Sequence, residues 1–104
     1  MNKYVPIELD KARNLKMGLR AMSLIENAFD MPFAKIKFEA LKLEELMIVL
    51  HAGLVHEDET LTPNKVMDIM DEYGNIEATF KKLFKAIELG FMRKNVQRAT
   101  KAKK

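Results

Sequence analysis

The chain has 104 residues, of which 48% are hydrophobic and 32% charged, a composition that suits one soluble globular domain and is too apolar for an intrinsically disordered chain. It has no apolar run near the roughly 20 residues of a membrane span, and the lack of cysteine excludes disulfides, thiolate metal sites and cysteine nucleophiles. The net charge of +3 hides an asymmetry, because residues 93–104 hold 6 of the 18 Lys and Arg residues and no acid, which leaves 12 basic against 15 acidic groups, or −3, in residues 1–92. We therefore predict one mildly acidic domain over residues 1–92 and a flexible basic tail over residues 93–104.

The first residues show the alternation of apolar and polar side chains that is typical of β-strands. The two runs are Val5-Ile7-Leu9 and Leu15-Met17, separated by residues 10–13. This pattern predicts a small β-hairpin. Because residues 10–13 lack the Asn-Gly or Asp-Gly pair that tight turns favour, an extended arm is the alternative.

Residues 18–29 change to the period of an amphipathic helix, with apolar side chains at every third or fourth position. Pro32 is expected to follow the end of this helix, since proline removes a backbone donor and crowds the preceding turn. Residues 33–42 fit neither period, and we interpret them as a connector whose aromatic side chains insert into the core.

The stretch from Leu43 to Gly74 carries the clearest pattern, that of two helices joined by an acidic turn. The first helix contains Gly53, where glycine costs about 1 kcal/mol of helix propensity relative to alanine. We therefore expect another element to approach the backbone closely at Gly53. In the second helix Thr62 suits the N-cap, Pro63 suits the first helical position, and Gly74 suits a left-handed stop.

A last helix is predicted to follow Asn75, a suitable cap, with apolar side chains at helical spacing as far as Phe91. Gly90 either ends this helix near Leu89 or is passed over at a cost of about 1 kcal/mol. The predicted fold class is therefore mainly α, with four or more helices and a small N-terminal β-hairpin or extended arm.

The sequence contains no recognisable catalytic signature. His51 and His56 point about 140° apart on one helix and cannot share a metal ion. The acidic turn that follows lacks the ligand spacing of a calcium loop, because Leu61 and Pro63 occupy positions where ligands would fall. Phosphate-cradling glycine motifs and nucleophile elbows are also absent. We predict a protein that is not an enzyme and has no catalytic residue, metal or cofactor.

Eight methionines are a mild excess, and flexible thioether side chains suit a groove that receives a partner segment, although core filling is the alternative. The basic tail is either an electrostatic arm for a partner or a solvated terminus. The candidate partner-binding residues are Met47, Leu54, Met67, Met70, Tyr73, Phe91, Met92, Arg93, Lys94 and Arg98.

Four segments in order resemble the tail assembly chaperones of long-tailed bacteriophages and prophages. They are RNLKMGLRAM (13–22), ELMIVLHAGLVHED (45–58), TLTPNKVMDIMDEYG (60–74) and KAIELGF (85–91). The resemblance covers about residues 5–92. The sequence departs from it in the predicted hairpin turn, where Asp10-Lys11 replaces an expected glycine.

The resemblance implies a non-enzymatic protein in the cytoplasm of the bacterial host that is absent from the mature virion. Its expected partners are the tape measure protein, which it keeps soluble, the tail tube protein, which it helps to recruit, and copies of itself. The alternative is a small helix-turn-helix regulator that binds nucleic acid through residues 43–74. The predicted recognition helix has Lys65 but also Asp68, Asp71 and Glu72, and these acids are poorly suited to phosphates.

Overall fold

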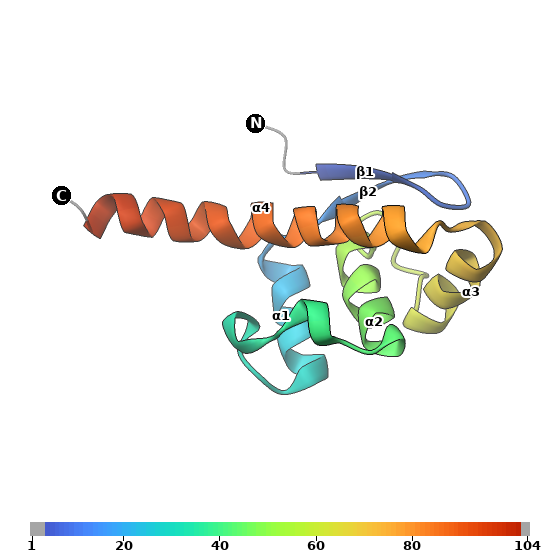
Figure 1. Ribbon diagram of the computed structural model, residues 1–104, viewed down its shortest axis with the longest axis horizontal. Helices are drawn as coiled ribbons and strands as arrows, with labels where there is room; N and C mark the ends of the chain where they lie inside the picture. Colours follow the sequence, from blue (N-terminus) through green and yellow to red (C-terminus); the bar gives the residue numbers. More distant parts are fainter. Residues whose placement is uncertain (1–3, 103–104) are drawn as a thin grey trace.

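The computed structural model describes the backbone of residues 4–102 and the side chains of residues 4–91. In these residues a two-stranded hairpin is followed by four α-helices, as predicted (Figure 1). The elements are β1 (Tyr4–Glu8), β2 (Ala12–Lys16), α1 (Leu19–Phe29), the 3-10 turns η1 (Phe33–Lys35) and η2 (Phe38–Ala40), α2 (Leu43–Leu54), α3 (Pro63–Tyr73) and α4 (Ile76–Ala102).

The N-terminal residues form a true hairpin rather than an extended arm. β1 and β2 pair antiparallel, with Val5 opposite Leu15 and Ile7 opposite Arg13. These four side chains are buried and so lie on the core face of the hairpin. Arg13 was expected between the two runs, and it instead belongs to β2 and is only 4% exposed.

The connector after α1 begins with Asp30, which adopts a left-handed conformation (φ 54°) and ends the helix just before Pro32. Phe33 is then buried, and its ring lies 5.1 Å from that of Phe38, centroid to centroid. The expectation that aromatic side chains of this connector enter the core is confirmed for Phe33, whereas Phe38 remains partly exposed.

The predicted start of α3 is confirmed in detail. Thr62 is the N-cap, its Oγ1 accepts a hydrogen bond from the backbone N–H of Lys65 at 3.1 Å, and Pro63 occupies the first helical turn. The prediction for Gly74 is wrong, because this residue is extended (φ −82°, ψ 153°) rather than left-handed. Glycine is needed there for space, since a Cβ would lie 2.9 Å from the backbone carbonyl oxygen of Met70, which cannot move aside.

Gly53 in α2 is approached closely, as expected. An added Cβ would lie 3.1 Å from Leu15 Cδ2, so the hairpin packs against this helix where the side chain is missing. Leu15 and Leu54 beside it are almost fully buried. The core thus has its centre where the hairpin meets α2.

α4 begins at an N-cap, because Asn75 Oδ1 accepts a hydrogen bond from the N–H of Ala78 at 2.9 Å. The helix passes through Gly90 without a break, packs against β1 and β2, and runs along the longest axis of the molecule (Figure 1). Its helical backbone continues to Ala102, across the predicted start of the tail at residue 93. The flexibility assigned to that tail stays a prediction.

α4 comes very close to the chain after β2 at Gly90. A Cβ at this position would overlap the backbone carbonyl oxygen of Met17 and lie 3.2 Å from the Met17 Cβ. A backbone atom cannot move aside as a side-chain end can. Gly90 therefore fixes how closely α4 can approach the residue that follows β2.

Replacing Gly90 with alanine should lower the free energy of unfolding by about 1–3 kcal/mol through overpacking. In an unhindered helix the same change would raise stability by about 1 kcal/mol. Gly53→Ala is the matched comparison, because its Cβ would meet only the end of the Leu15 side chain and should cost less. Urea unfolding of both variants measures the difference, and a Gly90→Ala protein more stable than the wild type would contradict the close contact.

Candidate functional site

An open groove lies between the connector and the first half of α4. Its volume is about 560 Å³, and its apolar lining comes from Phe38 in η2 and from Phe84, Ile87 and Phe91 in α4. The three phenylalanines are partly exposed, and Ile87 is buried beneath them. The groove therefore offers aromatic surface to solvent along one side of a helix.

Four charged side chains form the rim of this groove: Glu39, Lys81, Lys85 and Glu88. All are exposed, and within residues 4–91 none of them has an ion-pair partner. An apolar floor with a charged rim suits a peptide segment or helix better than a small metabolite, which usually binds in an enclosed cavity.

Phe33 holds the two walls of the groove together. Its ring lies 5.1 Å from that of Phe38 and 5.5 Å from that of Phe91, both in tilted arrangements. The backbone N–H of Phe33 donates a 2.7 Å hydrogen bond to the carboxylate of Glu26 in α1. Because α1 fixes the position of Phe33, the aromatic rings of the groove are set before any partner arrives.

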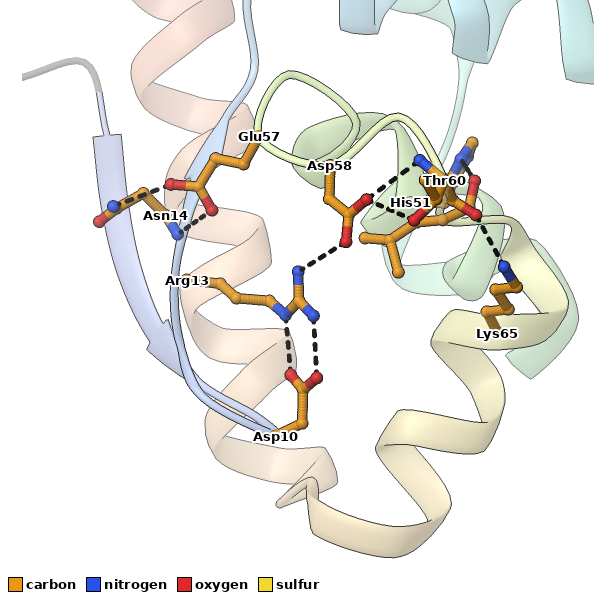
Figure 2. Close-up of polar contacts among 9 residues, drawn as sticks. Asp10, Arg13, Asn14, His51, Glu57, Asp58, Thr60 and Lys65 are labelled. Atoms are coloured by element: carbon orange, nitrogen blue, oxygen red, sulfur yellow. Dashed lines mark hydrogen bonds and ion pairs between the residues drawn. The ribbon is translucent and has the colours of Figure 1, made fainter.

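A second feature, here called the Arg13 cluster, joins the hairpin to the turn between α2 and α3 (Figure 2). It comprises Asp10, Arg13, Asn14, Glu57 and Asp58. The Arg13 guanidinium donates to both carboxylate oxygens of Asp10 at 2.8 and 2.9 Å and lies 3.8 Å from Asp58. The buried cation thus has a carboxylate from each of the two segments.

Asn14 extends this junction toward solvent. Its backbone N–H and its side-chain amide both donate to the carboxylate of Glu57, at 3.2 and 3.0 Å. The His56 ring lies 2.8 Å, Nε2 to O, from the Asn14 carbonyl oxygen, which accepts the bond. The acidic turn after α2 thus docks onto β2.

The hydrogen bonds lower the pKa values of the three carboxyl groups. The bond from Arg13 is the main cause for Asp10, and the bonds from Thr60 are the main cause for Asp58. Partial burial opposes ionisation of Glu57, but the bonds from Asn14 outweigh it, so the pKa of Glu57 also lies below its usual value. Ionised carboxylates therefore stabilise the folded state.

The carboxylates of Glu57 and Asp58 are directed to Arg13, Asn14 and Thr60 rather than to each other. In the part of the chain that the structure describes, no group of three or more acidic or histidine side chains is arranged to hold a metal ion. His51 is half-buried, with Nε2 3.0 Å from the Leu61 carbonyl oxygen. Both histidines thus contribute to packing and loop geometry.

The structure separates the candidate partner-binding residues. Met47, Leu54 and Met70 are buried in the core, so they cannot form a binding surface. Tyr73 is 59% exposed on α3, and Met67 on the same helix is half-buried against the core. Of the candidates with described side chains, Phe91 alone lines the groove. The side chains of the remaining candidates, Met92, Arg93, Lys94 and Arg98, lie outside the described residues.

Sequence reasoning did not identify most of the groove. The sequence predicts that Phe38 enters the core and that Phe84 is one of the apolar side chains of the last helix, and it does not single out the charged residues of the rim. The available signal was the row of Lys81, Phe84, Glu88 and Phe91, which recurs at intervals of three and four residues along α4. The exposed surface of α3 carries Asp68, Asp71 and Glu72, as its sequence indicated.

No protein-family model, curated protein or solved structure matches this chain. Among the described residues, every helix is too short or too polar to cross a membrane. We therefore infer the function from the groove and from the residues that hold it.

Lowering the pH from about 6 to 3 should destabilise the fold. A carboxyl group whose pKa is depressed by folding contributes stability above its unfolded pKa, and that contribution is lost as the pH falls through the folded pKa. The ordinary values are 3.8 for Asp10 and Asp58 and 4.5 for Glu57, so the loss should begin below about pH 5.

The midpoint of urea unfolding, measured across this range, tests the expectation. Arg13→Met keeps an apolar stem on the core face and removes the main partner of Asp10. Its midpoint should therefore depend less on pH than that of the wild type. Equal pH dependence in both proteins would show that the Asp10–Arg13 pair is not responsible.

Proposed function

We propose that this chain is a tail assembly chaperone of a long-tailed phage or prophage that binds helical segments of the tape measure protein in the aromatic groove. It acts in the cytoplasm of the bacterial host, helps to recruit tail tube subunits and leaves before the virion is complete. It performs this role without catalytic chemistry. The supporting observation is the groove lined by Phe38, Phe84 and Phe91, which exposes aromatic side chains along α4.

The shape of the groove favours a helix as ligand. An amphipathic helix inserts apolar side chains at positions i, i+3, i+4 and i+7 into such a groove, and the row of residues on α4 has the same spacing. The rim has both signs of charge, with Lys81 and Lys85 toward one end and Glu88 toward the other. A bound helix can therefore be oriented by charge while its apolar side is covered.

A long tape measure protein presents many such segments. Each groove needs only a modest affinity, because several copies along one chain cover its apolar surface together, and linked weak contacts reinforce each other. This arrangement would keep the tape measure protein soluble until tube subunits replace the chaperone. Of the four sequence segments that resemble the chaperone family, KAIELGF (85–91) contributes Lys85, Ile87, Glu88 and Phe91 to the groove.

Co-expression with the tape measure protein of the same genome tests the proposal. The wild-type chain should keep that protein in the soluble fraction and co-purify with it. Phe84→Asp places a charge on the groove floor and should abolish the effect. Leu43→Asp is the matched control, because it adds the same charge at an exposed apolar residue of α2 that does not line the groove.

Thermal melts of both variants show whether each has folded. A tape measure protein that stays insoluble and unbound at every level of the wild-type chain would refute the proposed function. A salt-sensitive shift of duplex DNA by the purified chain would support the helix-turn-helix regulator instead.

A further inference from the structure

One stripe along α4 would be complementary to itself in two antiparallel copies, because its two central residues are alike and its two ends have opposite charge. Glu77, Phe84, Phe91 and Arg98 follow one another at intervals of seven residues. Seven residues make two helical turns, so successive members differ by only about 20° in direction. The two phenylalanines occupy the groove, and the ends of the stripe carry opposite charges.

We propose that α4 of a second copy of this chain occupies the groove, packed antiparallel across a two-fold axis midway between Phe84 and Phe91. This operation places Phe84 of each copy beside Phe91 of the other. It also places Glu77 of each copy beside position 98 of the other. The interface is self-complementary, as two-fold contacts between identical chains must be.

The charges near the axis also complement each other. In this register Lys85 lies opposite position 90 of the other copy, two residues or about 3 Å along the axis from Glu88 of that copy. Each Lys85 therefore reaches a Glu88, and symmetry forms the contact twice. Both side chains are exposed rim residues that have no ion-pair partner within residues 4–91.

The C-terminal part of α4 favours the same arrangement. Its backbone continues as a helix to Ala102 and extends past the rest of the molecule (Figure 1). An isolated helical stretch of this length is marginal in water unless it packs against something. In the antiparallel pair it lies along the start of the other α4, beside the acidic Glu77.

Charge excludes the parallel alternative. Residues 93–104 carry six basic groups and no acid, whereas the preceding residues sum to −3. A parallel pair would bring the two basic segments together, and the antiparallel pair separates them. The second copy thus fits both the apolar floor of the groove and the distribution of charge.

This dimer goes beyond the proposed function, because it is a property of the chain alone. It covers the same phenylalanines that a partner helix would contact. A partner helix must then displace the second copy, and free chaperone does not expose aromatic surface. The absence of a tape measure protein has no effect on whether the dimer forms.

Cysteine cross-linking tests the orientation, and the cysteine-free chain gives no background. Glu77→Cys and Arg98→Cys are purified separately, mixed and mildly oxidised. Disulfide-linked dimers should form in the mixture far faster than in either variant alone, because only the antiparallel pair brings the two positions together. Glu77→Cys mixed with Glu59→Cys is the control and should stay unlinked. Rapid linking of Glu77→Cys alone would overturn the antiparallel arrangement.

Charge reversal tests the contact by sedimentation of the purified chain over a range of concentrations. The wild type should dimerise, and Glu77→Arg should weaken the dimer about tenfold, because two symmetric attractions become repulsions. Adding Arg98→Glu to that variant should restore the wild-type affinity within a few-fold. A wild-type chain that is monomeric at every concentration overturns the proposal. If that monomer still solubilises the tape measure protein, the proposed function stands without the dimer.

Discussion

The buried cation of Arg13 is the constraint on which the packing of this molecule depends. Its guanidinium is held by Asp10 from the hairpin loop and by Asp58 from the turn after α2. A buried charge left without a partner costs several kcal/mol, so Arg13 is buried beside Asp10, and Asp58 brings a second carboxylate from the other segment. α4 in turn packs on the hairpin. An ion-pair junction on one side of the molecule thus sets the surface on which the groove-forming helix lies.

The helices and the hairpin could be predicted because their signals are local. The N-cap of Thr62 and the helical spacing of α2 depend on residues within one or two turns. Gly74 shows the limit of such signals, since glycine suits both a left-handed stop and a close contact. Its contact with Met70, rather than its backbone dihedral angle, explains the glycine.

The Arg13 cluster and the groove could not be predicted, because both join residues that are distant in the sequence. Arg13 continues the inward alternation of Leu15 and Met17, but its partner Asp58 lies 45 residues away. Phe84 and Phe91 belong to the same series of helically spaced apolar residues as the core residue Leu83. This spacing alone does not tell which side of α4 the rest of the protein covers. The sequence likewise does not separate methionines that bind a partner from those that fill the core. Met47 and Met70 were candidates for partner binding, and both are buried in the core.

Because α4 runs without a break through Gly90, the number of residues between its N-cap and Gly90 is fixed. One added or missing residue between Asn75 and Gly90 would rotate the rest of the helix by about 100°. Gly90 would then turn away from Met17, and Phe91 would turn away from Phe33 at the same time. The residue that packs against Met17 and the residue that lines the groove therefore keep a fixed angular relation around this helix. Homologous chains should conserve the spacing from the Asn75 cap to Phe91 even where their exposed residues have diverged.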